Sequence, residues 1–371
     1  MNANPFSYDR PLPPEEAIDR PRERVLLAQL AEGGQTSRLA APRRYGKTTL
    51  LGALAAELRS RRWIVSIVDF SRSRTIEDVV ERLYDGWRRG LDRRGTGSLW
   101  KKANREFEAA IEAGIPGVAR ATVRGRPAAR GEGPLARLHG LLALPEWLAE
   151  ADGQRRALVV FDEFQDLLTA GEDLDGLLRS HVQHHVGIAS YCYAGSQASL
   201  MRALFEDRSR PLFGQAREVS LPPLPAGAIA DWVAERLASG GKSLPPETAA
   251  ALAAGSHGHP QRAAMVAHFL WQQSRLDEAG LRNAEAEALN AAEGELAQLW
   301  SDLTRPQRQV LGAVAEGEAR LLSKPALGAM GLGKSTAQQA RDGLEAEGYI
   351  RRDNRSFSGV DPFLGRWLRS P

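Results

Sequence analysis

The sequence contains a single cysteine, Cys192, in 371 residues. One cysteine excludes an internal disulfide framework and any metal site built from a cysteine cluster, and it suits a reducing compartment. The chain also has no uninterrupted apolar run of about 18 residues, the length that a membrane-spanning helix needs. Its first residues include prolines and acidic side chains instead of the apolar core of an export signal. We therefore expect a cytoplasmic protein without a membrane segment.

Charge is only weakly unbalanced, with a net charge of +3. This is too little to require a nucleic-acid partner. Residues 301–371 hold eleven Lys and Arg against eight Asp and Glu, and this difference of +3 equals the excess of the whole chain. The hydrophobic content of 43% is enough for two or three cores. Three of the seven histidines, His181, His184 and His185, lie close together. Metal binding is one interpretation of their spacing, but we favour a polar helix face.

Residues 38–51, RLAAPRRYGKTTLL, predict a phosphate-binding loop. The pattern G-x-x-x-x-G-K-[ST] acts when a strand enters the loop and a helix leaves it, so that backbone N–H groups converge on phosphate. A short strand is expected at 38–41 and a helix at 48–59. We place Lys47 on the β- and γ-phosphate oxygens and Thr48 on Mg²⁺. The nucleotide-binding residues predicted here are Pro42, Arg43, Arg44, Tyr45, Gly46, Lys47, Thr48 and Thr49.

An acidic strand is the second part of the predicted site. Residues 157–161 are apolar without alternation, which indicates a parallel strand buried on both faces. Asp162 and Glu163 follow at its carboxyl end, where open α/β sheets bind ligands. We predict that Asp162 holds Mg²⁺ and that Glu163 polarises the water that attacks the γ-phosphate. Ser196 ends another predicted strand, at 188–197, and is expected to contact the γ-phosphate or that water. A Gly-Ser turn without a chemical role is the alternative.

The C-terminal residues predict two helical modules. Residues 226–300 alternate helical segments with glycine and proline breaks, which indicates a helical lid. From 301 onward, three short helices and a hairpin at 349–357 predict a winged helix-turn-helix. A second, tidier loop-like match, GAMGLGKS at 328–335, falls on its turn. No strand precedes that match, so we predict that Lys334 does not bind nucleotide. Ser335 or Thr336 is expected to cap the third helix.

Two segments carry features of nucleic-acid binding, and each has a second interpretation. Polar side chains on the third helix and the wing suit double-stranded DNA, whereas acidic residues farther along the helix suit a protein partner. An insertion at 96–150 contains an arginine-rich stretch, either a solvated loop, which we favour, or a basic patch. The residues of the third helix and the wing that suit DNA are Lys334, Ser335, Thr336, Gln338, Gln339, Arg341, Arg351, Arg352 and Arg355. The arginines of the insertion are Arg120, Arg124, Arg126, Arg130 and Arg137.

Together these motifs resemble the archaeal-type ATPases, a prokaryotic branch of the STAND/AAA+ group of P-loop NTPases. Five segments in the family's order carry the resemblance, namely 4–8 with 18–23, 42–48, 161–165, 258–260 and 360–369. The resemblance implies an α/β P-loop NTPase domain with a parallel sheet, then an α-helical lid and a C-terminal winged helix. It also implies that the N-terminal segment packs near the adenine. His259 and Pro260, in the lid's G-x-P motif, would place a helix end against the nucleotide. For His259 itself we favour packing or capping over chemistry.

Two positions depart from the family's pattern. Ala41 stands where the loop usually begins with glycine, and alanine adopts positive φ less easily. Gln215 occupies the slot in which related sequences tend to carry an arginine. The candidates for an arginine finger are then Arg210, Arg217 and a residue of another subunit. Slow hydrolysis is expected, because such a finger accelerates turnover by orders of magnitude.

The function predicted from the sequence is an ATP-driven switch that controls the winged helix. We expect a P-loop domain at 1–224, a lid at 225–300 and a winged helix at 301–371, with ATP or ADP and Mg²⁺ as cofactors. Hydrolysis of ATP to ADP and phosphate is expected to be slow. Two alternatives stay open. One is a DNA-binding regulator in which ATP is structural, and the other is an AAA+-like assembly ATPase whose neighbouring subunit completes the site.

Overall fold

The computed structural model describes residues 3–18, 20–91, 101, 133–152, 156–171, 173–354 and 356–369. Most of the predicted insertion lies outside these residues, and of its five arginines only Arg137 is described. The chain forms two compact units. The sheet unit comprises Arg20–Ala40 and Leu50–Ser220. The lid–wing unit comprises Met1–Asp19, Ala41–Thr49 and Leu221–Pro371. The finer division at 224/225 and 300/301 stays a proposal.

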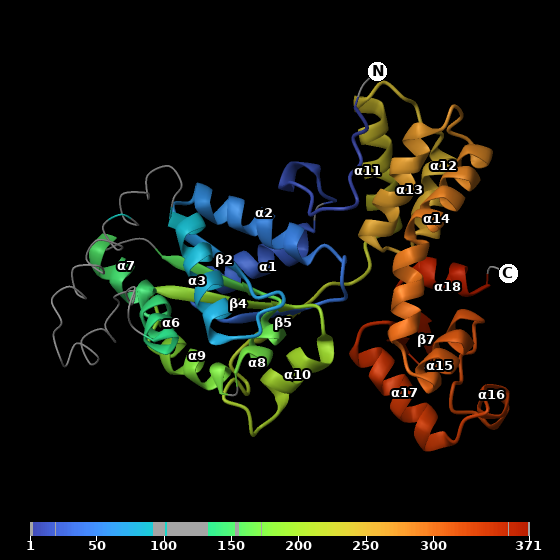
Figure 1. Ribbon diagram of the computed structural model, residues 1–371. Coiled ribbons are helices and arrows are strands. Elements are labelled where there is room, and N and C mark those ends of the chain that lie inside the picture. The colour runs from blue at the N-terminus through green and yellow to red at the C-terminus, as the bar shows by residue number, and fades with distance from the viewer. Residues whose placement is uncertain are drawn as a thin grey trace. The chain divides into compact units, whose positions relative to one another are not determined.

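A five-stranded parallel sheet forms the centre of the sheet unit (Figure 1). Its strand order is β2-β3-β4-β1-β5. Every position of β3 is buried, because its uninterrupted apolar run packs on both faces. The strand bounds are β1 (Ser37–Ala40), β2 (Ile64–Asp69), β3 (Ala157–Asp162), β4 (Ala189–Gly195) and β5 (Arg217–Ser220). The three strands predicted from the sequence, at 38–41, 157–161 and 188–197, are present as β1, β3 and β4, with ends shifted by at most two residues.

Helices connect the strands. α3 packs tightly on β2, where a Cβ at Gly90 would lie 2.9 Å from the carbonyl oxygen of Val65. Glycine at this position therefore sets the distance between helix and strand. The helices are α1 (Pro21–Glu32), α2 (Lys47–Ser60), α3 (Ile76–Leu91), α6 (Pro134–Leu142), α7 (Leu144–Asp152), α8 (Leu167–Ala170), α9 (Leu174–Val182) and α10 (Ala198–Glu206), with the short helix η2 (Phe164–Asp166) after β3.

The histidine cluster differs from its predicted role. His181 and His185 are buried, whereas only His184 is exposed, so the segment is not a polar helix face. His181 Nε2 lies 2.9 Å from Nδ1 of His139 on α6. His185 Nδ1 is hydrogen-bonded to the Tyr191 hydroxyl, and its Nε2 lies 3.5 Å from Glu146. The imidazoles tie α9 and the following turn to the core. The described residues contain no group of three or more His, Cys, Asp or Glu that could hold a metal.

We expect the free energy of unfolding to fall as the pH drops from 6.5 towards 4. Burial, with smaller effects of His181 and His184, lowers the pKa of His185 from 6.5 to about 4. The folded state therefore favours the neutral ring, and the unfolded state takes up the proton first. The stabilisation is present above pH 6.5 and is lost through this window, by about 3 kcal/mol for one such imidazole. Urea unfolding across the window measures it.

Two variants separate this effect from general acid sensitivity. His185→Gln removes the titrating ring and should weaken the pH dependence of unfolding. His184→Gln, at the exposed neighbouring position, should leave it as in the wild type. Equal pH dependence in the His185→Gln and wild-type proteins would contradict the prediction.

The lid–wing unit has a continuous hydrophobic core that runs from Phe6 through the lid helices to Leu364. The lid consists of α11 (Ala226–Ser239), α12 (Pro246–Gly255), α13 (Pro260–Gln272) and α14 (Glu278–Asp302). The N-terminal arm, 3–18 with η1 (Pro14–Glu16), packs on these helices. The Phe6 ring lies 5.2 Å from that of Trp232, and Arg236 donates to the carbonyl of Pro5. Apolar burial thus fixes the arm to the lid.

Three helices and an antiparallel hairpin follow the lid, as predicted for a winged helix (Figure 1). Gly331, with φ of 63°, ends α16 and forms the turn before α17. The predicted cap is wrong: Gly333 is the N-cap of α17, and no side chain caps this end. The elements are α15 (Arg305–Ala315), α16 (Lys324–Met330), α17 (Lys334–Ala346), β6 (Ile350–Asp353), β7 (Ser356–Gly359) and α18 (Pro362–Arg369). No helix in the described part of the chain is long and apolar enough to cross a membrane.

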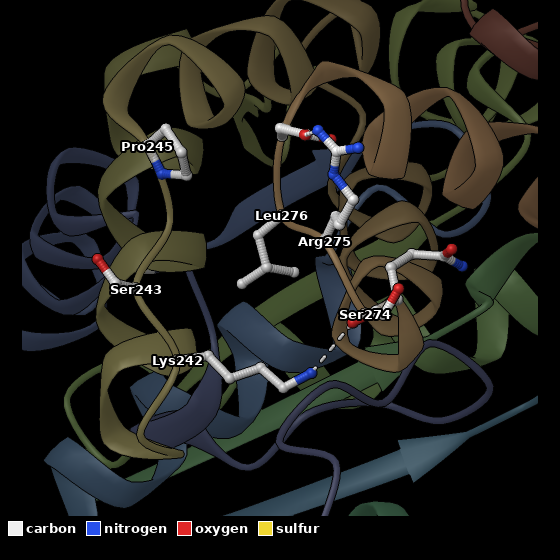
Figure 2. Close-up of a pocket in the computed structure, with 8 residues that line it drawn as sticks. Lys242, Ser243, Pro245, Ser274, Arg275 and Leu276 are labelled. Atoms are coloured by element: carbon white, nitrogen blue, oxygen red, sulfur yellow. Dashed lines mark hydrogen bonds and ion pairs between the residues drawn. The ribbon is translucent and has the colours of Figure 1, made fainter.

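A surface hollow of about 470 Å³ lies in the lid, between the α11–α12 and α13–α14 linkers (Figure 2). Lys242 spans it, donates to the Trp271 carbonyl and lies 4.8 Å from the centre of the Trp271 ring. It also donates to the carbonyl of Gln273 at 3.5 Å, so its charge joins the α11–α12 linker to the end of α13 and the linker that follows. The hollow is lined by Lys242, Ser243, Pro245, Gln273, Ser274, Arg275, Leu276 and Asp277, none of which was predicted to bind nucleotide.

Candidate functional site

The predicted phosphate-binding loop connects β1 directly to α2. Arg44 and Gly46 have φ of 62° and 88°, so the backbone turns twice through the left-handed region. Backbone N–H groups in such a turn form a concave surface that suits an anion. Ala41 is not among the residues with positive φ. The departure from glycine at this position therefore causes no backbone strain, because the left-handed residues come later in the loop.

Lys47 is the buried cation of the loop, with 5% of its surface exposed. Its Nζ donates to the carbonyl oxygens of Ala41, at 2.9 Å, and Pro42, at 3.3 Å. The ammonium group thus lies across the start of the loop. Thr48 is exposed on the first turn of α2, and Thr49 is half-buried. The structure places the lysine and the hydroxyl at the N-terminus of a 14-residue helix, where the helix dipole favours negative charge.

The lid contacts this loop within the lid–wing unit. The buried Tyr45 ring packs edge-on against His259 at 5.3 Å, and a Cβ at Gly46 would lie 3.9 Å from Pro260. His259 is the N-cap of α13, and its Nδ1 accepts from the N–H of Arg262 at 3.3 Å. Burial lowers the pKa of His259 to about 4, so the ring stays neutral and can accept this bond. The structure therefore brings His259 and Pro260 next to the loop and gives His259 a capping role.

The glycine of the G-x-P turn is required by its surroundings. Gly258 has φ of 75°, and a Cβ there would lie 2.7 Å from the carbonyl oxygen of Leu224. Only glycine fits both the left-handed backbone and this close approach. The turn fixes the start of α13, and with it the position of His259.

Asp162 and Glu163 lie at the carboxyl end of β3. Asp162 is 5% exposed and accepts from the N–H of Glu163 at 3.0 Å. Glu163 has a left-handed backbone, with φ of 48° and ψ of 44°. Such a conformation in a non-glycine residue costs about 1 kcal/mol or more and is common at functional sites.

Ser196 lies beside Glu163, although the sequence placed the two 33 residues apart. The Ser196 hydroxyl and N–H both donate to Glu163 Oε2, at 2.6 and 3.1 Å. Gln165 Nε2 donates to the same oxygen at 2.7 Å. Sequence reasoning did not assign Gln165 a role. Its position two residues after Glu163 was the only signal in the sequence.

The strand ends meet at one edge of the sheet because all five strands are parallel. Ala40, the last residue of β1, pairs with Gly195 on β4, and Phe161 pairs with Tyr193. The loop starts at the residue after Ala40. Parallel α/β sheets bind ligands at this edge.

The candidate arginines differ in their surroundings. Arg210 Nη2 lies 3.3 Å from the fully buried carboxylate of Asp175, so an ion pair within the sheet unit engages it. Arg217 is exposed on β5, and Gln215 is exposed and donates to the Phe213 carbonyl. Lys334, in the second loop-like match, is exposed at the start of α17 and follows a helix and a turn instead of a strand.

The strand order, the loop after β1 and the acidic end of β3 belong to an α/β fold with a parallel sheet. In fold the chain is similar to the Walker-type ATPase PABY2304 of Pyrococcus abyssi, with a TM-score of 0.72 and 19% identity, over 98% of this chain and 99% of that one. It is also similar to the ORC2 protein of Aeropyrum pernix in its ADPNP-ADP complexes, with a TM-score of 0.65 and 16% identity, over 97% and 94%. No family model and no curated protein sequence matches. The predicted resemblance to archaeal-type ATPases is thus confirmed for the fold.

Proposed function

We propose that this protein binds ATP with Mg²⁺, hydrolyses it slowly, and uses the nucleotide state to set the position of its winged helix. One observation carries the proposal: the phosphate-binding loop contacts both the lid and the winged helix inside a single compact unit. The fold, and the nucleotide complexes of the similar ORC2 structure, support nucleotide binding.

Four residues carry out the proposed binding and hydrolysis of ATP. Lys47 binds the β- and γ-phosphate oxygens, with the loop's N–H groups around it. Thr48 and Asp162 would hold Mg²⁺, whose charge would neutralise the phosphates. Glu163 takes a proton from the attacking water. The donors fit this assignment, because hydroxyl and carboxylate oxygens are the ligands that Mg²⁺ prefers.

Ionic contacts connect the loop to the lid. Arg44 is paired with Glu295 on α14. Glu295 also lies 3.6 Å from Arg262, which is 1% exposed on α13. A buried guanidinium needs strong partners, because an unpaired charge in the interior costs several kcal/mol.

The same arginine connects the lid to the end of the winged helix. Arg262 Nε and Nη2 donate to both carboxylate oxygens of Asp361, at 2.5 to 3.1 Å. Burial alone would raise the pKa of Asp361, but the hydrogen bonds and charge of Arg262 lower it, so the carboxylate stays charged. Pro42 of the loop packs against Gly348, just after α17, where a Cβ would lie 3.5 Å away. A movement of the loop would thus alter its contacts with both parts of the unit.

Glu295→Gln should weaken the coupling between nucleotide and winged helix without abolishing ATP binding. The change removes the negative charge that joins Arg44 to Arg262. Because Glu295 is 40% exposed, each of these ion pairs contributes only about 0–1 kcal/mol. Hydrogen exchange of α17 should differ between the ATP and ADP forms of the wild type. We expect this difference to shrink at least about twofold in the variant.

The control is Glu293→Gln, an exposed position on the same helix, which should behave as the wild type. Identical exchange of α17 in the ATP and ADP forms of the wild type would contradict the switch itself. A full wild-type difference in Glu295→Gln would contradict only this route of coupling.

DNA binding by the winged helix is the second candidate function. The observation in its favour is that the N-terminal half of α17 presents exposed polar side chains. However, Arg341 on α17 and Arg352 in the wing each lie 5.4 Å from the centre of the Phe357 ring, and Arg351 is paired with Asp353. Lys334 and the polar residues at the start of α17 would contact the bases, and Arg352, which stays exposed on the wing, would contact the DNA backbone. The set is Lys334, Ser335, Thr336, Gln338 and Gln339.

If this candidate is correct, affinity for random duplexes should fall steeply with salt. Removing Arg351, Arg352 and Arg355 together should reduce the salt slope by roughly one unit for each phosphate that the variant no longer binds. Arg355 lies outside the described residues. Changing Gln338 or Gln339 should alter sequence preference more than affinity. Gel shifts with ATP, with ADP and without nucleotide test this. No retention of any duplex at low salt in all three conditions would favour a protein partner.

An assembly ATPase remains the other alternative. In that case a neighbouring subunit supplies the arginine, and turnover per chain rises with protein concentration. Concentration-independent turnover would exclude it.

A further inference from the structure

One carboxylate oxygen of Glu163 receives three hydrogen bonds from two different elements of the sheet unit. The donors are Gln165 Nε2 on η2 and the hydroxyl and N–H of Ser196 after β4. Their distances to Oε2 are 2.7, 2.6 and 3.1 Å. Glutamate has several rotatable bonds, and three donors on a single oxygen restrict it to one orientation.

Gln165 is built into the fold at this point. It is 2% exposed, and its Nε2 makes a second bond, to Asp166 Oδ1 at 3.2 Å. The nitrogen must face the two carboxylates, because the amide oxygen has no proton to donate to them. Oε1 therefore points the other way, and within the described residues it has no hydrogen-bond partner. A buried acceptor without a hydrogen bond destabilises the folded state.

The last residue of β4 makes room for this amide. A Cβ at Gly195 would lie 2.4 Å from Gln165 Oε1 and 2.6 Å from Met201 Cγ, so any larger residue would push the glutamine away. The Gln165 amide is therefore oriented with its N–H groups towards Glu163 and Asp166. Its oxygen lies in the space that the missing side chain of Gly195 leaves open.

We propose that Gln165 is a positioning residue that, together with Ser196, holds the carboxylate of Glu163 in place for proton transfer from water. The inference rests on the proposed function, in which Glu163 is the base. A general base must lie within hydrogen-bond reach of the proton that it removes, and misplacement by about 1 Å can cost roughly 100-fold in rate. Gln165 makes no contact with substrate in this role. It acts through Glu163.

The test uses Gln165→Met in the full-length protein. Methionine has a similar volume and keeps the packing against Gly195, but it donates no hydrogen bond. We expect kcat for ATP to fall roughly 10- to 100-fold while KM and the affinity for a fluorescent ATP analogue change less than about twofold. Gln165→Ala is the second variant, and thermal unfolding of each protein shows whether it is folded.

A double variant separates positioning from a structural role. In the Glu163→Gln background, Gln165→Met should cause no further loss of turnover, because the group that it positions is already gone. A merely structural glutamine would give additive losses and a weaker ATP affinity. Either result would overturn the inference, and so would wild-type kcat in both Gln165 variants.

The same experiment distinguishes failure of the proposed function. If Glu163→Gln turns over ATP as fast as the wild type, or the wild type has no turnover, then Glu163 is not the base and both proposals fail. If Glu163→Gln is inactive but Gln165→Met has wild-type kcat, only the positioning role fails.

Discussion

Lys47→Ala should remove ATP binding, with a loss of affinity on the order of 100-fold or more. Lys47 is the buried cation of the loop and the first residue of α2. Its ammonium group is therefore the positive charge that we propose for the phosphate oxygens. Alanine removes this charge and also the bonds to the carbonyls of Ala41 and Pro42. Titration with a fluorescent ATP analogue in the presence of Mg²⁺ measures the change.

Lys334→Ala is the matched control, because Lys334 ends the tidier copy of the same pattern. Its side chain is exposed on α17, and no strand leads into the turn before it. Nucleotide affinity should therefore equal that of the wild type. Loss of affinity in Lys334→Ala but not in Lys47→Ala would reverse the assignment of the two motifs. Lys47→Arg, which keeps the charge, shows whether the loss comes from charge or from loop packing.

The sequence predicted the sheet well because parallel strands leave a strong local signal. An apolar run such as that of β3 is buried on both faces, and glycine, proline or a carboxylate marks its end. The winged helix was likewise predictable from short helices separated by a glycine turn. The motif at 41–48 was distinguished from the more regular one at 328–335 by the strand predicted before it and the helix predicted after it. In the structure, Ala41 does not have a left-handed backbone.

The contacts around the site were not predictable from local patterns. Arg44 and Glu295 are 251 residues apart, and Arg262 and Asp361 are 99 apart. Such pairs depend on how the chain returns to the loop, which neither periodicity nor spacing encodes. For the same reason the histidine segment was assigned wrongly. A histidine every few residues fits a polar face, but the partners of His181 and His185 come from α6, α7 and β4.

The contact between Gln165 and Glu163 was also not predictable from the sequence. Its side chain reaches Glu163 only because Glu163 adopts a left-handed backbone and the chain then turns through η2. An interpretation of the sequence that continues the strand would place the two residues on one face of an extended segment. Backbone strain at a functional site is a feature that residue patterns do not reveal.

Glu163→Gln should bind ATP like the wild type and trap it, with turnover reduced by roughly 100-fold or more. Glutamine keeps the shape, and its oxygen can still accept from Ser196, but it cannot take a proton from water at neutral pH. Wild-type turnover is itself expected to be slow, on the order of one per minute or less, because Gln215 occupies the usual arginine slot. Single-turnover release of labelled phosphate is therefore the suitable measurement.

The control for this variant is Glu81→Gln on α3, which makes the same chemical change at an exposed position of the sheet unit. It should leave turnover and ATP affinity unchanged. Wild-type turnover in Glu163→Gln would exclude Glu163 as the base. Loss of ATP affinity in that variant would instead indicate that the carboxylate supports binding. Retained affinity with lost turnover is the only pattern that a general base predicts, because the carboxylate is then needed in the transition state and not in the ground state.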